Sequence, residues 1–136
     1  MIERSFVIIK PDAVERRLIG RILSRFEDRG LTIRRMHLIT ISQELAERHY
    51  QEHVGKPFFD GLIKFITSTP SVIIVIEGEE AISDIRTMCG DTNPAHSTPG
   101  TIRGDFATMT SRNIIHSSDS QDSAKREIYN FFGDVD

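Results

Sequence analysis

The segment from Asn113 to Ser120 holds the residue types that chemistry on a phosphate group would need. Two apolar residues precede His116 and a run of helix-capping residues follows it, which predicts a histidine at the end of a short buried strand, facing the start of a helix. A helix N-terminus offers free N–H groups and a positive dipole end, so it favours anions such as phosphate. His116 could therefore act as a nucleophile toward phosphorus.

Glu127 is the candidate partner of this histidine. An imidazole nucleophile needs a group that orients its second ring nitrogen. Glu127 lies eight residues past Asp119 on the same predicted helix, about two turns on. An isolated glutamate on a helix is more often an exposed surface carboxylate, so this assignment depends on the fold bringing the two side chains together.

Three cations in distant parts of the chain could complete the site: Lys10, Arg86 and Arg103. Phosphoryl transfer spreads negative charge over three oxygens, and its catalysis rests on positioning and on cationic clamps. Each of the three could equally be an ordinary surface charge. Lys10 is the least ordinary, because it directly follows a buried apolar run. The chain has no GxxxxGK[ST] loop, so phosphate binding would have to proceed without one.

The elements that must position these residues follow from hydrophobic periodicity. Asp12 fits the N-cap of a helix over residues 13–29, with Glu15 in capping-box position and Gly30 ending the helix. The other predicted elements are strands at Phe6–Ile9, Leu31–Ile41, Val72–Ile76 and Asn113–His116, short helices after Ser42 and after Pro57, and helices at 80–89 and 119–132. Residues 90–112 lack clear periodicity, and a loop of that length is usually functional.

The order is β-α-β-(α-α)-β-α-loop-β-α. Without the inserted helix pair this is βαββαβ plus a terminal helix, the pattern of an α+β, ferredoxin-like fold. We therefore expect a four-stranded antiparallel sheet with helices packed on one face.

Bulk composition limits the class of protein. The 136 residues are expected to form one domain, and 38% hydrophobic with 27% charged residues is ordinary for a globular protein. A net charge of −3 argues against a nucleic-acid partner. The single cysteine suits a reducing compartment, and no signal peptide or membrane-spanning run is evident, so we expect a cytoplasmic protein with no membrane partner.

The segment around His116 resembles the active-site signature of nucleoside diphosphate kinases, Asn-Ile-Ile-His-Gly-Ser-Asp-Ser. The resemblance covers nearly the whole chain, because four further motifs occur in the family's order: Ile9-Lys10-Pro11-Asp12, Gly55-Lys56-Pro57-Phe58-Phe59, Gly90-Asp91-Thr92-Asn93-Pro94 and Pro99-Gly100-Thr101-Ile102-Arg103. One departure is plain: Ser117 stands where the family usually has glycine.

The resemblance implies a mechanism. Nδ1 of His116 would attack the γ-phosphate of a nucleoside triphosphate, typically ATP, and a nucleoside diphosphate would then take the phosphate from the histidine. Glu127 would accept a hydrogen bond from Nε2–H of His116, and the Ser118 hydroxyl would lie near the transferring phosphate or in the same network. Mg²⁺ would arrive bridging the nucleotide phosphates, with few or no protein ligands.

The resemblance also assigns the residues that hold the nucleotide. The phosphates fall to Arg86, Arg103 and Thr92, with His53 nearby. The sugar hydroxyls fall to Lys10 and Asn113, with Tyr50 positioning Lys10. Phe58 would stack on the base beside Leu62, and stacking tolerates any base.

Three questions stay open in the sequence. Ser117 would be strained if the glycine serves a positive φ, and harmless if the backbone there is extended; we expect retained activity. A catalytically weakened ferredoxin-like interaction scaffold is the alternative function, although all the motif residues for catalysis are present. The resemblance implies a homo-oligomer, and we expect a hexamer rather than a tetramer, with Thr98 and Pro99 in the loop at trimer contacts.

Overall fold

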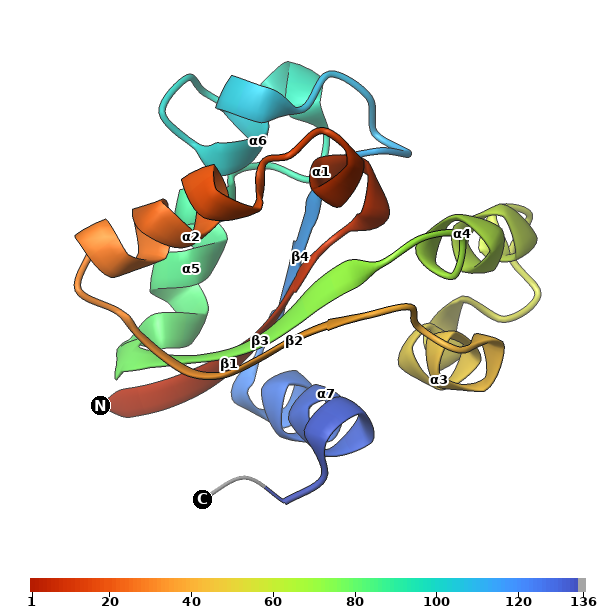
Figure 1. Cartoon of the computed structure of the whole chain (residues 1–136), viewed down its shortest axis with the longest axis horizontal. Helices are drawn as coiled ribbons and strands as arrows, with labels where there is room; N and C mark the ends of the chain where they lie inside the picture. The colour runs from red at the N-terminus through yellow and green to blue at the C-terminus, as the bar shows by residue number, and fades with distance from the viewer. Residues whose placement is uncertain (135–136) are drawn as a thin grey trace.

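A four-stranded antiparallel sheet forms the centre of the molecule in the computed structural model, which describes residues 1–134 (Figure 1). The strands are β1 (Ile2–Ile9), β2 (Thr32–Ile39), β3 (Ser71–Glu79) and β4 (Ile115–Ser117), in the order β2-β3-β1-β4. Every neighbouring pair is antiparallel. The predicted α+β, ferredoxin-like fold is confirmed, and β1, which leads to Lys10, lies beside β4, which carries His116.

Seven α-helices and two 3₁₀ turns connect and follow these strands in the described residues. They are α1 (Pro11–Glu15), α2 (Ile19–Asp28), α3 (Gln43–His49), η1 (Gln51–His53), α4 (Phe59–Ile66), α5 (Ala81–Cys89), η2 (Pro94–His96), α6 (Ile102–Phe106) and α7 (Gln121–Phe132). The stretch 90–112, predicted as a loop, thus contains two short helical turns. None of these helices is long and apolar enough to cross a membrane.

The helices cover both faces of the sheet, so the expectation that they pack on one face was wrong. Successive strand residues point to opposite faces. Val7 and Ile9 join a core with α1, α2 and α5, whereas Phe6 and Ile8 join a second core with α3, α4 and α7. Figure 1 shows α2 and α5 on one side of the strands and α7 on the other. A strand that is apolar on both faces needs cover on both.

The single helix predicted over 13–29 is two helices. Arg17 adopts a left-handed φ of 60°, and the N–H of Leu18 bonds to the carbonyl of Ala13. This closes α1 with the hydrogen bond of a Schellman turn, a role usually taken by glycine. Gly30 ends α2 as predicted, with φ of 90°.

The predicted helix start at Asp12 was also wrong. Lys10 is the N-cap and Pro11 the first helical residue, as the fixed φ of proline favours. The Glu15 carboxylate accepts a hydrogen bond from Thr69 Oγ1 instead of closing a capping box. The Asp12 carboxylate reaches across to Ile114, as described below.

The last strand begins at Ile115 and not at Asn113. Ile114 has a φ of 62°, which is incompatible with extended pairing, so Asn113 and Ile114 form a turn ahead of β4. His116 consequently lies in the middle of β4, paired with Ile8, rather than at its end. Helix α7 begins after Ser120, whose hydroxyl accepts from the N–H of Ser123.

Candidate active site

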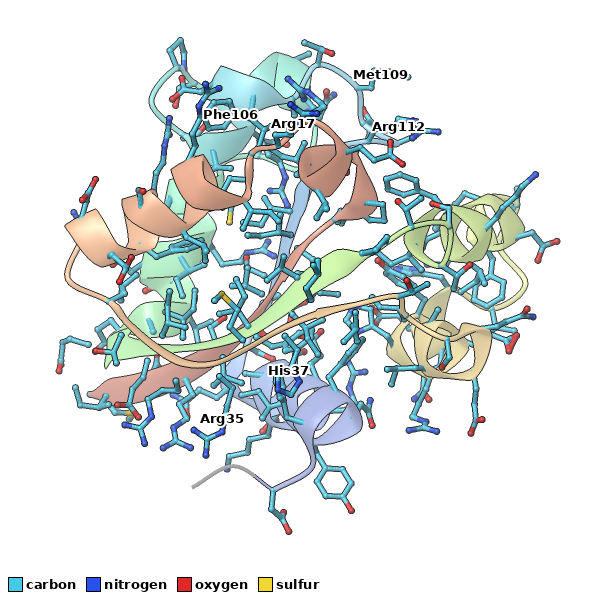
Figure 2. The ribbon with its side chains drawn as sticks, viewed as in Figure 1. Arg17, Arg35, His37, Phe106, Met109 and Arg112 are labelled. Atoms are coloured by element: carbon cyan, nitrogen blue, oxygen red, sulfur yellow. The ribbon has the colours of Figure 1, made fainter. Side chains whose placement is uncertain are left out.

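A cleft opens where β1 ends and β4 begins, between the 90–112 segment and α4. It has a volume of about 850 Å³, and a smaller pocket of about 210 Å³ adjoins it at His116. Arg112 reaches from the loop toward α4 (Figure 2), where its guanidinium lies 4.8 Å from the centre of the Phe65 ring. Of the predicted site residues, ten line one or both hollows: Lys10, Tyr50, Phe58, Leu62, Arg86, Thr92, Arg103, Asn113, His116 and Glu127.

His116 is oriented by a buried carboxylate. Its Nε2 lies 3.1 Å from Oε1 of Glu127, a residue that is 4% exposed. A carboxylate oxygen only accepts, so this contact assigns the hydrogen to Nε2 and leaves the lone pair on Nδ1. The ring itself is partly exposed to the smaller pocket. This arrangement leaves one ring nitrogen of His116 free and holds the ring by the other.

Ser118 completes this network from inside the protein. Its hydroxyl donates to Oε1 of Glu127 at 2.7 Å and accepts from the N–H of Phe6 at 3.0 Å. Ser118 is fully buried, so its hydroxyl belongs to the Glu127 network and does not face the cleft. It is not a helix cap either, since Ser120 fills that position. The serine ties the carboxylate to β1.

His49 is a neighbour that the sequence did not single out. Its ring meets that of His116 edge to face, with centroids 4.8 Å apart and planes at 85°. Burial, and next the charge of His116, hold the pKa of His49 well below its usual value. His49 is therefore a neutral ring packed against His116. Its position beside Tyr50 at the end of α3 was the available signal.

Lys10 and Asn113, the two residues expected to contact the sugar, lie next to each other. Lys10 Nζ donates to Asn113 Oδ1 at 2.8 Å, and Asn113 Nδ2 donates to the carbonyl of Thr92 at 3.0 Å. Burial, and next the charge of Arg103, lower the pKa of Lys10 to about 8. Thr92 itself is exposed at the edge of the cleft.

Arg103 is held mainly by backbone carbonyls. Its guanidinium donates to the carbonyl oxygens of Gly90 at 2.7 Å, Ile115 at 2.7 Å and Asn113 at 3.3 Å. Burial is the main cause that lowers its pKa. Arg86 is exposed on α5 and lines the smaller pocket with Arg103. Together the two arginines place positive charge beside His116.

Tyr50 lines the cleft, but its hydroxyl has no hydrogen-bond partner among the described residues. No hydrogen bond therefore joins Tyr50 to Lys10, the residue that the resemblance expects it to position, and Lys10 bonds to Asn113. Burial raises the pKa of Tyr50, with the charge of Glu127 as a smaller cause. Tyr50 is thus a neutral phenol at the cleft wall.

Phe58 presents an open aromatic face. It is 53% exposed, whereas its neighbour Phe59 packs against the core, as the adjacent pair predicts. The ring of His53 lies 5.3 Å from that of Phe58, and Lys56 Nζ lies 5.8 Å from its centre. Leu62 lines the same cleft one turn along α4. This wall suits a flat, apolar group.

Ser117 occupies an extended position in β4, paired with Val7. It is not among the residues with positive φ, so serine carries no backbone strain there. A hydrogen bond from Ser117 acts on the thiol of Cys89, whose pKa is raised overall by burial. The side chain thus points into the core under α5.

The described residues form no oxygen-rich cage for Mg²⁺. The one cluster of possible metal ligands found among them is His49, His116 and Glu127, with donor atoms within 4.8 Å of one another. Two of its three donors are imidazole nitrogens, whereas Mg²⁺ prefers oxygen ligands in octahedral geometry. The donor set therefore does not fit a resident Mg²⁺.

The comparisons with known proteins agree on one family. The family model for nucleoside diphosphate kinase matches residues 3–136. The chain belongs to the nucleoside diphosphate kinase family. A nucleoside diphosphate kinase of Methanobrevibacter smithii is 61% identical over 134 residues, covering 98% of this chain and 89% of the relative. That of Methanocaldococcus jannaschii is 56% identical over 132 residues, covering 97% and 94%.

Solved structures of this family superpose closely on the fold. A halophilic nucleoside diphosphate kinase from Halobacterium salinarum, in complex with CDP, matches with a TM-score of 0.96 and 46% identity, covering 100% of this chain and 93% of the other. An apo nucleoside diphosphate kinase from Encephalitozoon cuniculi gives 0.95 and 41%, covering 97% and 90%. As a nucleoside diphosphate kinase, the chain is an enzyme that transfers phosphate between nucleotides.

Proposed function

We propose that the enzyme works through a phosphohistidine on His116. The observation that carries this proposal is the 3.1 Å contact between His116 Nε2 and the buried Glu127, which leaves Nδ1 as the free nucleophilic nitrogen. In the first half-reaction Nδ1 forms a bond to the γ-phosphorus as the bond from phosphorus to the β–γ bridging oxygen breaks. The nucleoside diphosphate leaves with that oxygen. In the second half-reaction a different nucleoside diphosphate takes the phosphate, which restores the neutral imidazole.

Glu127 and Ser118 act on the histidine rather than on the phosphate. Positive charge develops on the ring as Nδ1 attacks, and the adjacent carboxylate stabilises it. The Ser118 hydroxyl and its bond to the N–H of Phe6 keep that carboxylate in place. Both residues are thus proposed to set the ring's tautomer and orientation.

The nucleotide is proposed to lie in the larger cleft. Arg86, Arg103 and Thr92 would contact the phosphates, with His53 at their side. Lys10 and Asn113 would contact the sugar hydroxyls, and Phe58 with Leu62 would hold the base. Broad specificity for the base is expected because the base wall is an aromatic face with no fixed hydrogen-bond pattern. ATP is the expected phosphate donor.

Mg²⁺ is proposed as the cofactor; it would be held mainly by the nucleotide phosphates and would neutralise part of their charge. The cluster of His49, His116 and Glu127 supplies two nitrogens and one carboxylate rather than an oxygen cage, which is consistent with a metal held by the substrate. Arg86, exposed on α5, and the N–H groups of Arg103 that its three carbonyl partners leave unused would then contact the other phosphate oxygens.

The assembly is proposed to be a hexamer rather than a tetramer, and the compartment the cytoplasm. Thr98 and Pro99 are exposed in the loop that the resemblance places at trimer contacts. Cys89 is a buried free thiol, as suits a reducing compartment. Residues 1–136 are proposed to act as one domain, and both cores of the described part share the central strand β1.

Steady-state kinetics test the two-step route. Initial rates are measured while ATP and a nucleoside diphosphate, such as GDP, are varied together. A phosphoenzyme predicts parallel lines in double-reciprocal plots, because each substrate reacts with a different form of the enzyme. Intersecting lines would contradict the proposal, since they require both nucleotides bound at once.

A further inference from the structure

The turn that precedes β4 is strained. Ile114 has a φ of 62°, a conformation that a β-branched residue strongly disfavours. The N–H of Ile115 donates to the carbonyl of Asn113, two residues back, at 2.8 Å. A γ-turn with positive φ at its centre is rare and strained. Contacts from outside the turn must therefore hold it.

Asp12 supplies the side-chain contact that does so. The N–H of Ile114 donates to Asp12 Oδ2 at 3.1 Å, and the carbonyl of Ile114 accepts from the N–H of Lys10 at 2.9 Å. The two residues that flank Pro11 thus bond to both backbone polar groups of Ile114. Asp12 is only 6% exposed, and its Oδ1 has no hydrogen-bond partner among the described residues. Burying a carboxylate so incompletely bonded is unfavourable for stability, which points to another reason for its presence.

The turn sits between two parts of the site. Asn113, the first residue of the turn, bonds to Lys10 Nζ and to the carbonyl of Thr92. His116 follows two residues after it, on β4. A relaxed backbone at Ile114 would move these two side chains relative to each other.

We infer that Asp12 is a positioning residue for phosphate transfer: its carboxylate holds the strained turn at Ile114 and so fixes Asn113 and His116 relative to each other. This inference rests on the proposed role of His116 as the phosphate acceptor. Asp12 is not among the residues that line the two hollows of the site. Its carboxylate bonds to the backbone of the turn instead.

The test measures the rate at which His116 takes phosphate from labelled ATP in single-turnover experiments. Asp12→Ala removes the acceptor for the Ile114 N–H, and we expect the rate to fall about a hundredfold, as for a misplacement near 1 Å. Asp12→Asn keeps an oxygen acceptor of the same shape but not the charge, and should retain most of the rate. Equal losses in the two variants would overturn the inference, because the charge beside Lys10 would then be what matters.

A second pair of variants isolates the turn. Ile114→Gly and Ile114→Ala remove nearly the same side chain from the core, but only glycine adopts a positive φ freely. In the Asp12→Ala background, Ile114→Gly should bring the rate to within about tenfold of Ile114→Gly alone, while Ile114→Ala should not. If Asp12→Ala lowered the rate by the same factor beside Ile114→Gly as beside Ile114→Ala, the inference would be overturned. This comparison holds even if Asp12→Ala alone folds poorly.

The wild-type protein separates failure of the inference from failure of the proposed function. No label on wild-type His116 would remove the phosphohistidine mechanism, and this inference with it. Normal labelling of both wild type and Asp12→Ala would overturn only the role of Asp12.

Discussion

At the scale of single residues, the site depends on groups whose charge is set by burial. Glu127 and His49 are both buried beside His116, one as an acceptor and one as a neutral ring. Burial also lowers the pKa of Lys10, to about 8. Such shifts are frequent where a protein handles charged substrates.

Lys10 predicts the alkaline limit of activity. The ammonium is charged below a pH of about 8 and is lost as the pH rises through that value, so kcat/KM should fall by about tenfold or more above it, the worth of a charged hydrogen bond. The measurement is kcat/KM for the nucleotide as a function of pH. In Lys10→Arg, which stays charged, this alkaline fall should disappear even though overall activity is lower. The same fall in both proteins would contradict the assignment to Lys10.

Ser117 predicts a small effect on turnover. Its backbone is extended and its side chain faces Cys89, so Ser117→Gly should change kcat by less than about tenfold. Glycine in a strand should instead lower the free energy of unfolding by about 0.5–1 kcal/mol. Turnover and denaturant unfolding of both proteins check this. A rise in kcat of about a hundredfold would show that serine impairs the natural site.

At the scale of elements, the sequence predicted the four strands apart from the start of the last one, the helix that starts after Ser42 and the helix end at Gly30. It missed the break between α1 and α2, because the apolar periodicity continues through Arg17 with no glycine or proline. It also missed the turn at Ile114, where the residue type argues for a strand. Both misses concern left-handed residues of types that rarely adopt this conformation. The turn at Ile114 is held by Lys10 and Asp12, about a hundred residues away, which no local pattern encodes.

Gly104 tests how tightly α6, the helix that carries Arg103, packs against the preceding loop. A Cβ on Gly104 would lie 2.0 Å from the carbonyl oxygen of Thr98, so Gly104→Ala must shift backbone and should lower the free energy of unfolding by about 1–3 kcal/mol. Gly20→Ala in α2 meets nothing within 4 Å and should raise it by about 0.5–1 kcal/mol. Denaturant titrations compare the two. Equal effects would mean that the loop yields to the new methyl group.

At the scale of the whole molecule, one sheet carries two cores and brings distant segments to one edge. Lys10, which follows β1, meets residues of α5, the 90–112 segment and β4 there, although these segments span most of the chain. The cation positions could be foreseen only through the resemblance, since nothing local distinguishes Arg86 or Arg103 from surface charges. Figure 2 shows a further long-range contact, His37 of β2 against α7, where its ring lies 5.3 Å from that of Phe132.

The assembly is predicted to be hexameric. Sedimentation equilibrium or light scattering on the purified protein should give six times the mass of one chain over a range of concentrations. Four times that mass would contradict the proposed hexamer, while leaving the chemistry at His116 untouched.

The phosphohistidine itself is the most direct test of the account. The protein is incubated with γ-labelled ATP and Mg²⁺ and quenched in alkali, in which phosphohistidine survives. The account predicts alkali-stable, acid-labile label that moves onto added GDP, is lost in His116→Ala and persists in His96→Ala, a change at an exposed histidine outside both hollows. A folded wild-type protein that takes no label, or label that persists in His116→Ala, would contradict it.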